Sequence, residues 1–309
     1  MQAFLLVSYG SPERQEDVVP FLNNLFAGNN VPVERVSAAV QKYERYVAKT
    51  GHYSPLNSEC RKLVAGLRRI APDLPIYWGN LFWHPLLTDT VAKMVQDGIK
   101  RAVCFATSAF DSPSGNQRYA DALASAAYAN PPIVIEKMPL PFEHPLFIEA
   151  QSERLLEMLT GDLVDSQTRI LFSAHSIPLA DAARCRYTEQ LLSTCRMVID
   201  KIGTAIPWDL VYQSRSGAAE HWLGYDIKEY IRELAAAGEC RSVIVSPIGF
   251  FCENMETEYD LDIEVGECCS ELGLAFYRAK AVSAMPHICR LLLHLGFEYT
   301  GKQRPPAPQ

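Results

Sequence analysis

Short apolar runs rich in β-branched residues alternate along the chain with longer segments in which apolar residues recur at helical spacing. The segments 84–98 and 147–161 are examples of this spacing. A strand followed by a helix, repeated many times, predicts parallel sheets with helices on both faces and therefore an α/β fold. The runs form two groups of four, at 3–10, 75–82, 101–108 and 132–138 and then at 169–176, 209–214, 242–250 and 275–281.

The two groups of predicted strands favour two similar α/β domains. Three prolines in residues 139–145 mark the crossover, so we expect an N-terminal domain at 1–140 and a C-terminal domain at 141–300. The last helix of the second domain can pack back on the first. The tail 301–309 shows no pattern and is expected to be mobile. Ligands of such sheets bind beyond the carboxyl ends of the strands, so a cleft between the domains is the expected binding site.

The composition is that of a globular protein and narrows its class. The 309 residues are 48% apolar and 21% charged, and the net charge of −7 disfavours nucleic acid as the main partner. The N-terminal apolar run is too short for a signal sequence, and no apolar stretch approaches the ~20 residues of a membrane span. The nine cysteines include no CxxC pair, which favours reduced, buried thiols. We therefore expect a cytoplasmic protein without a transmembrane segment.

A histidine stands at the carboxyl end of the fifth predicted strand. His175 is thereby placed where βα loops converge on a ligand. A lone histidine is most often a hydrogen-bonded structural residue, but this position favours proton transfer or transient metal binding. None of the seven histidines shows HxxxH spacing, which disfavours a local zinc site.

An acidic segment follows the seventh predicted strand. Read as a helix that starts near Glu253, it places Glu256, Asp260 and Glu264 at i, i+4 and i+8 on one face. One interpretation is a solvated acidic face, and the other is a ladder of oxygen ligands that conducts a divalent cation. Glu256 lies in the first turn, next to the edge where His175 is expected to emerge, which favours the second interpretation.

Aromatic, hydroxyl and guanidinium groups gather in the loops of the first half. Tyr9 follows the first strand, and no glycine-rich dinucleotide fingerprint comes after it. Its side chain suits either ordinary core packing or a ligand at the strand end. The neighbouring loops suit an apolar ligand with peripheral carboxylates. Their candidate groups are Arg45, Tyr46, Ser54, Asn57, Ser112, Ser114, Arg118 and Tyr119.

Taken together, these segments resemble the ferrochelatase family, whose members insert ferrous iron into porphyrins. The resemblance covers nearly the whole chain and is most specific at LFSAHSIP (171–178) and PIGFFCENMETEYDLD (247–262). It implies a lyase of haem biosynthesis with two Rossmann-like domains and a porphyrin cleft between them. Further matches are YGSPE (9–13), YSPLN (53–57), GNLFWHP (79–85), VYQSRSG (211–217) and HWLG (221–224).

The resemblance also implies roles for single residues. His175 and Glu256 match the catalytic pair, which also binds metal, and Asp260 and Glu264 match an acidic line that delivers metal or removes protons. Tyr9 matches the residue on the opposite face of the macrocycle. With a tyrosine at this position, the chain resembles the enzymes that convert coproporphyrin III to coprohaem III. Protoporphyrin enzymes usually carry methionine there. The implied porphyrin-binding set is Tyr9, Arg45, Tyr46, Ser54, Arg118 and Tyr119.

The chain departs from the family pattern at several positions. Glu253-Asn254 stands where the family often has Asp-His, and Leu81 stands at a position that is frequently basic. The segment NLFAGNN (24–30) lacks the arginines that many coproporphyrin relatives carry. Protoporphyrin IX therefore stays open as the substrate. Two other functions also stay open: a cobalt or nickel chelatase, which Asn254 disfavours because such enzymes carry additional histidines, and a non-catalytic carrier of porphyrin or haem.

Some relatives bind an iron–sulfur cluster through a cysteine in the segment that is DSPSGNQRY (111–119) here, together with a cysteine group near the C-terminus. In this chain Asn116 occupies that loop and the tail has no cysteine. We therefore expect no iron–sulfur cluster and no other prosthetic group. Fe²⁺ is expected as a substrate together with the porphyrin, and the enzymes before and after this step of haem biosynthesis are candidate protein partners.

Overall fold

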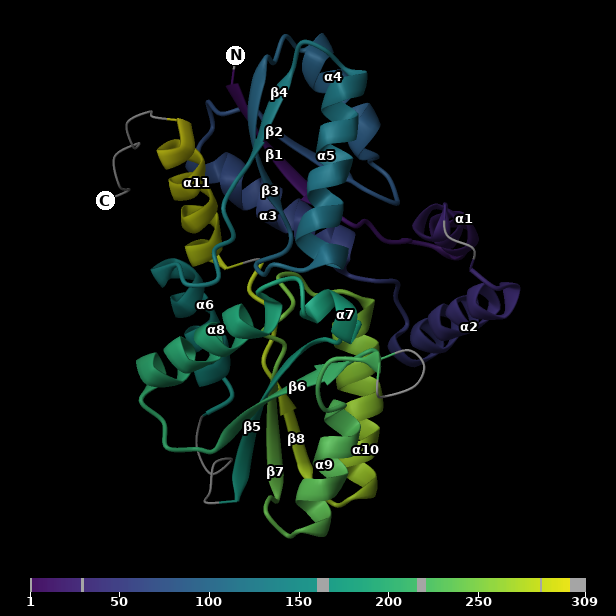
Figure 1. Ribbon diagram of the computed structural model, residues 1–309, viewed down its shortest axis with the longest axis vertical. Coiled ribbons are helices and arrows are strands. Elements are labelled where there is room, and N and C mark those ends of the chain that lie inside the picture. The colour runs from purple at the N-terminus through teal and green to yellow at the C-terminus, as the bar shows by residue number, and fades with distance from the viewer. Residues whose placement is uncertain (1, 29–30, 160–166, 216–220, 284, 301–309) are drawn as a thin grey trace. The chain divides into compact units, whose positions relative to one another are not determined.

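The chain folds into two parallel four-stranded sheets, as the alternation of strands and helices predicts (Figure 1). The computed structural model describes residues 2–28, 31–159, 167–215, 221–283 and 285–300. The first sheet contains β1 (Gln2–Ser8), β2 (Ile76–Asn80), β3 (Arg101–Ala106) and β4 (Val134–Lys137) in the order β2-β1-β3-β4. The second contains β5 (Thr168–His175), β6 (Trp208–Gln213), β7 (Ser242–Ser246) and β8 (Ala275–Arg278) in the order β6-β5-β7-β8.

The chain divides into two compact units with one sheet each. The expected domain boundary between residues 140 and 141 stays a prediction. The expected mobile tail, 301–309, lies outside the described residues. The first unit contains residues 1–107, 119–138 and 292–309, and the second contains 108–118 and 139–291.

Helices cover the first sheet because β1, one of its two internal strands, is apolar on both sides. Leu5 and Val7 of β1 pack against Val91 and Leu123 in one buried cluster. Leu6 points to the other face and is also fully buried. The helices of this half are α1 (Gln15–Phe26), α2 (Val33–Thr50), α3 (Leu56–Ile70), α4 (Leu87–Gln96) and α5 (Arg118–Ala129). Figure 1 shows α4 and α5 side by side along this sheet.

The second sheet repeats this arrangement. Leu171 of β5 and Val245 of β7 pack against Ile231 and Leu261, whereas Phe172 is fully buried on the opposite side of β5. The remaining helices are η1 (Pro113–Gln117), α6 (Pro145–Leu156), α7 (Leu179–Ala182), α8 (Tyr187–Ile202), α9 (Ile227–Ala236), η4 (Thr257–Val265), α10 (Gly266–Glu271) and α11 (Pro286–Thr300). In Figure 1, α9 and α10 run along one side of the second sheet and α8 lies on the other.

The parallel register brings the carboxyl ends of the second unit's strands to one edge. His175 is the last residue of β5 and pairs with Gln213, the last residue of β6. The neighbouring β7 ends at Ser246, and the acidic segment follows from the same edge. The fold therefore places the histidine and the acidic segment together, as the sequence predicts.

Two further expectations concern the membrane and the thiols. Within the described parts of the chain, no helix is both long and apolar enough to cross a membrane. Eight of the nine cysteines are buried, and Cys185 has intermediate exposure. The predicted burial of the thiols is thus confirmed.

Candidate functional site

His175 and Glu256 face each other at the carboxyl edge of the second sheet. His175 ends β5, and Glu256 directly precedes η4. The imidazole Nε2 lies 3.6 Å from the carboxylate Oε1 of Glu256, and the two side chains are 39% and 36% exposed. The two residues predicted as a pair therefore come together, and both side chains remain accessible to a ligand.

The second ring nitrogen of His175 is held by the backbone. Nδ1 contacts the backbone carbonyl oxygen of Ser176, which can only accept, so Nδ1 donates and Nε2 faces Glu256. Burial alone would lower the pKa of His175, but Glu256, the Ser176 carbonyl and Asp260 raise this pKa to about 9. The imidazole is therefore protonated at neutral pH, although a histidine of ordinary pKa would be mostly neutral there.

A side-chain cap fixes the backbone of Glu256. Oδ1 of Asn254 accepts hydrogen bonds from the backbone N–H groups of Glu256 (2.7 Å) and Thr257 (3.0 Å). The backbone N–H of Asn254 in turn donates to Oγ1 of Thr257 at 3.0 Å, which makes the capping reciprocal. Asn254, which departs from the family's usual histidine, therefore starts the helical segment that carries Glu256.

A second hydrogen-bond chain reaches Glu256 from the sheet. Oγ of Ser173 donates to Oε1 of Gln213 at 2.6 Å, and Nε2 of Gln213 donates to the backbone carbonyl of Glu256 at 3.2 Å. Ser173 and Gln213 are both buried. Because Gln213 also pairs with His175 in the sheet, its side chain ties the histidine strand to the carboxylate segment. Sequence reasoning missed this role, although a glutamine at the end of a buried strand is a signal for it.

A buried ion pair holds the loop in front of Glu256. Glu253 accepts hydrogen bonds from Nη1 of Arg278 (2.9 and 3.1 Å), from the Ala281 N–H (2.6 Å) and from the Thr257 hydroxyl (2.7 Å). The side chains of Glu253 and Arg278 are 10% and 7% exposed. Burial alone would raise the pKa of Glu253, but Arg278 and the other donors hold it below its ordinary value. Glu253 is thus an ionised structural carboxylate that joins β8 to this loop.

The acidic segment that follows is a π-helix, which corrects the α-helix expected from the sequence. The structure assigns π geometry to η4, Thr257–Val265. A π-helix closes hydrogen bonds between residues i and i+5, one position wider than an α-helix. Residues four apart stay near one face in both geometries, so the spacing of the carboxylates could not distinguish them. Such turns are rare and occur frequently at functional sites.

Asp260 and Glu264 lie in different surroundings. Asp260 is 6% exposed, and the hydroxyl of Ser214 donates to its Oδ2. Ser214 has a φ of 62°, a left-handed conformation that is uncommon for residues other than glycine. Glu264 accepts a hydrogen bond from Nζ of Lys228 at 2.6 Å. Burial of Asp260 does not suit a solvated acidic face, and the metal-binding roles of Asp260 and Glu264 stay predictions.

The cap at Asn254 leads to a first prediction. We expect Asn254→Ala to lower the free energy of unfolding by about 0.5–2 kcal/mol, because two backbone N–H groups lose their acceptor. Metal insertion should fall as well, by up to about 10²-fold, since small displacements of a reacting group are costly. Urea unfolding and an insertion assay measure the two effects. Asn254→Asp keeps the acceptor oxygen and should retain most of the stability. Wild-type stability and turnover in Asn254→Ala would contradict the role.

In the first unit, Tyr9 follows the carboxyl end of the internal strand β1. Its ring packs edge-on against Tyr119 and tilted against Phe82, with centroids 5.4 and 5.2 Å apart. Tyr9 keeps partial exposure. Tyr119 is 2% exposed, and its hydroxyl lies 3.1 Å from Oγ1 of Thr107. Tyr119 therefore supports Tyr9 from the core. In this conformation Tyr119 is too buried to contact a ligand directly.

The other residues of the predicted porphyrin-binding set also differ in burial. Tyr46 is fully buried, with its hydroxyl 3.5 Å from the carbonyl of Tyr53, and Ser54 is 6% exposed. These two side chains could contact a ligand only after a local rearrangement. Arg45 is exposed and Arg118 is partly exposed. The binding roles of the whole set stay predictions.

Two features of the first unit lie outside the candidate chemistry. Asn57 is fully buried, donates to the carbonyl of Ser11 at 3.1 Å and accepts from Asn80 at 3.3 Å, so it serves to hold loops together. A surface pocket of about 1140 Å³ is lined by residues of α3, β2 and α4, including Trp78. None of the residues predicted for the site lines this pocket.

Comparison with solved structures supports the fold. The sirohydrochlorin chelatase SirB from Bacillus subtilis subspecies spizizenii, in complex with cobalt, aligns with a TM-score of 0.57 over 96% of this chain and 94% of its own. The sequence identity is 13%, so the likeness concerns the fold alone.

Sequence comparison is more specific. A ferrochelatase from Rhodopirellula baltica is 39% identical over 308 residues, which cover 97% of this chain and 86% of that protein. A coproporphyrin III ferrochelatase from Frankia alni is 38% identical, with 96% of this chain and 79% of that protein covered. The ferrochelatase family model matches residues 1–298. The chain therefore belongs to the ferrochelatase family.

Proposed function

We propose that the chain is a coproporphyrin ferrochelatase, which inserts Fe²⁺ into coproporphyrin III and yields coprohaem III in haem biosynthesis. The observation that carries the chemistry is the His175–Glu256 pair at the edge of the second sheet. Relatives named coproporphyrin III ferrochelatase, from Frankia alni and Nocardia farcinica, support the substrate at 38% identity over nearly the full chain.

Tyr9 is the residue of this chain that favours the same substrate. It matches the tyrosine of coproporphyrin enzymes, and the resemblance assigns it to the macrocycle face opposite the His175–Glu256 pair. Coproporphyrin carries four propionates, and charge-assisted hydrogen bonds to carboxylates are worth about 1.5–3 kcal/mol each. The exposed Arg45 and partly exposed Arg118 are cations that can supply such bonds. The arginine-free segment 24–30 favours protoporphyrin IX, which is the alternative substrate; residues 29–30 lie outside the described structure.

The protonation of the pair sets the order of events in metal insertion. Two pyrrole protons must leave while the metal arrives, and the carboxylate of Glu256, which faces His175, is a group that can accept one of them. Nε2 of the His175 imidazolium has no free lone pair, so Fe²⁺ can bind there only after its proton leaves. Arrival of iron at His175 and release of a proton are therefore linked steps of the proposed mechanism.

The acidic line is proposed as the path for iron or for protons. Asp260 is the buried member next to the pair, and its charge contributes to the raised pKa of His175. Glu264 is 35% exposed and bound to Lys228, so a metal ion reaches its carboxylate only if Lys228 releases it. Nitrogen and oxygen ligands of this kind accept Fe²⁺ and also tolerate Zn²⁺ or Co²⁺.

The substrate is tested by comparing kcat/KM for coproporphyrin III and protoporphyrin IX with anaerobic Fe²⁺. We expect a preference of about tenfold or more for coproporphyrin III, because its additional propionates gain charge-assisted hydrogen bonds. Tyr9→Phe is the matched variant: it keeps the ring that packs on Phe82 and Tyr119 and removes only the hydroxyl oxygen. A clear preference for protoporphyrin IX would overturn the substrate, and porphyrin binding without insertion of Fe²⁺ or Zn²⁺ would favour a carrier.

We also propose that the protein holds no iron–sulfur cluster. Nδ2 of Asn116, the residue in the loop where some relatives carry a cluster cysteine, donates to Asp111 at 3.1 Å. Protein isolated without oxygen should contain no acid-labile sulfide. Its visible absorption should show only the bands of any bound porphyrin or haem, without those of a cluster. One sulfide-containing cluster per chain would contradict this expectation.

The proposed setting is the cytoplasm, with the enzymes that supply the porphyrin and receive the haem product as partners. The support for this setting is the family membership and the small, negatively charged globular chain. Co-purification of the tagged protein from a cytosolic fraction tests it.

A further inference from the structure

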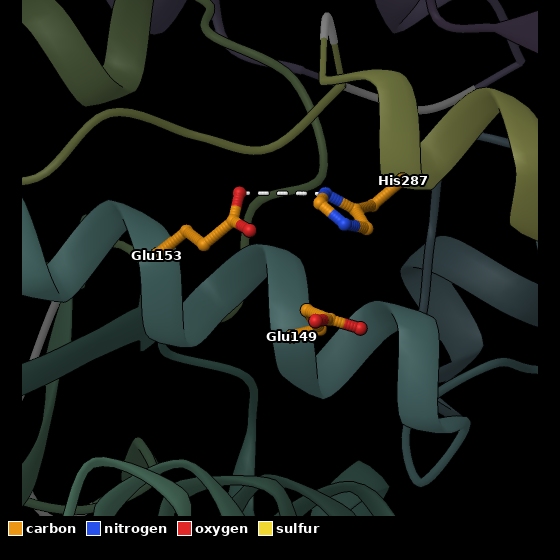
Figure 2. A group of neighbouring side chains, drawn as sticks. All are labelled: Glu149, Glu153 and His287. Carbon is orange, nitrogen blue, oxygen red and sulfur yellow. Dashed lines mark ion pairs between the residues drawn. The ribbon is translucent and has the colours of Figure 1, made fainter.

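A second group of metal-ligating side chains lies between α6 and the start of α11, within the second unit. Glu149 and Glu153 stand one turn apart on α6, and His287 is the second residue of α11. One possible ligand atom from each residue lies within 4.8 Å of the other two. Figure 2 shows the imidazole of His287 facing the carboxylate of Glu153, with Glu149 on the neighbouring turn of the same helix.

The contact between His287 and Glu153 has the dimensions of a metal site rather than of a hydrogen bond. Nδ1 of His287 is buried and makes no hydrogen bond to the described residues, although Oε2 of Glu153 is 3.3 Å away. Zinc–nitrogen and zinc–oxygen distances of ~2.1 Å place two ligands of a tetrahedral ion about 3.4 Å apart. The observed separation therefore matches one edge of a tetrahedron, with the nitrogen aimed at the carboxylate.

The local charge also favours a cation. Among the described residues, Glu149 has no ion pair, and Glu153 pairs with His287. The nearest cation along α6, Arg154, bonds to Glu157 instead. No lysine or arginine in the described parts of the chain therefore pairs with either carboxylate. Each ligand comes from a helix, which holds it more firmly than a loop would.

We propose that Glu149, Glu153 and His287 form a second binding site, for a divalent transition metal of the Zn²⁺ or Fe²⁺ class. One nitrogen and two oxygen donors suit these borderline ions, whereas Ca²⁺ and Mg²⁺ prefer oxygen alone. Three protein ligands leave the fourth tetrahedral position for water. A rotation of the Glu149 side chain completes the set, and the bound ion ties the start of α11 to α6.

The test uses the whole chain in a His175→Ala/Glu256→Gln background, which removes the two central metal ligands of the proposed insertion site. After treatment with a chelator, Zn²⁺ is titrated by calorimetry and Co²⁺ by visible absorption. We expect one equivalent of Zn²⁺ and the intense absorption bands of tetrahedral Co²⁺. In this background, His287→Gln and Glu149→Gln should each weaken Zn²⁺ binding by at least about tenfold. Glu157→Gln is the control, a carboxylate at the C-cap of α6 that bonds to Arg154 instead, and it should leave Zn²⁺ binding unchanged.

Two results would overturn the proposal. The first is that the background protein binds no Zn²⁺, or that it binds Zn²⁺ with the same affinity after His287→Gln or Glu149→Gln is added. The other is the absence of tetrahedral Co²⁺ bands, which would leave only an ion pair between protonated His287 and Glu153. Should His287→Gln unfold, Glu149→Gln decides, because the carboxylate of Glu149 makes no hydrogen bond or ion pair with the described residues. Neither result depends on the porphyrin substrate, so this site and the proposed function can fail separately.

Discussion

His175→Ala is expected to lower the rate of Fe²⁺ insertion by about 10²–10⁴-fold, the range that a positioned proton-transfer group contributes. The substitution removes the imidazole that faces Glu256 and leaves the carboxylate without its cationic partner. Porphyrin binding should be largely unchanged, because contacts at the edges of the macrocycle hold it. Anaerobic insertion kinetics and porphyrin fluorescence quenching measure the two quantities separately.

A control for this variant is His294→Gln, which alters another partly buried imidazole, on α11. Insertion in this control should stay within about twofold of wild type, since His294 belongs to neither proposed metal site. Near-normal turnover in His175→Ala would refute the assignment of the pair. Equal losses of turnover and of porphyrin affinity would instead assign His175 to binding.

Arg278→Met is expected to lower the free energy of unfolding by about 3–5 kcal/mol, because it leaves the carboxylate of Glu253 buried without its cation. The loop before Glu256 loses its anchor to β8 in the same step. Urea unfolding at pH 7 measures the loss. Arg101→Met is the control. Arg101 pairs with Glu136 at the surface, where the two side chains are 65% and 34% exposed, so this substitution should lower the free energy of unfolding by at most about 1 kcal/mol.

The pH dependence separates this mechanism from a loss of packing. In the wild type the pKa of Glu253 lies below its ordinary value of 4.5, so its stabilisation is present above pH 4.5 and is lost as the pH falls below it. Without Arg278, burial raises the pKa of Glu253, so this variant gains stability as Glu253 takes up a proton. The difference between the two proteins should therefore narrow from pH 7 to pH 5. A constant difference, or a cost no larger than that of Arg101→Met, would contradict the account.

The strands and their grouping could be predicted because each strand is a local pattern of apolar residues. The run at 3–10 appears as β1 (Gln2–Ser8), and the run at 169–176 appears as β5 (Thr168–His175). His175 was identifiable because a histidine directly after a buried strand has a defined place in an α/β fold. Glu256 was identifiable because the strand before it ends at the same edge.

The parts that could not be predicted depend on contacts between distant residues or on backbone geometry. Nothing near Glu253 in the sequence indicates that Arg278 is its partner. The π geometry of η4 arises from hydrogen bonding and leaves no mark in the spacing of the carboxylates. The cap at Asn254 could have been found, because asparagine is a preferred N-cap residue at the start of a helix. The burial of Tyr46 could not, since tyrosine is compatible with both surface and core.

The parallel topology has a consequence for how the chain reaches this structure during synthesis. Every strand pair joins residues far apart in sequence: Phe4 of β1 pairs with Ile76 on one side and with Val103 on the other. No hairpin can therefore form early, and the apolar β1 stays without a partner strand until β2, about 70 residues later, has left the ribosome. Folds dominated by such distant pairings form slowly and expose apolar segments meanwhile. The first apolar strand is thus the part of this protein that most needs protection by a chaperone before its sheet can close.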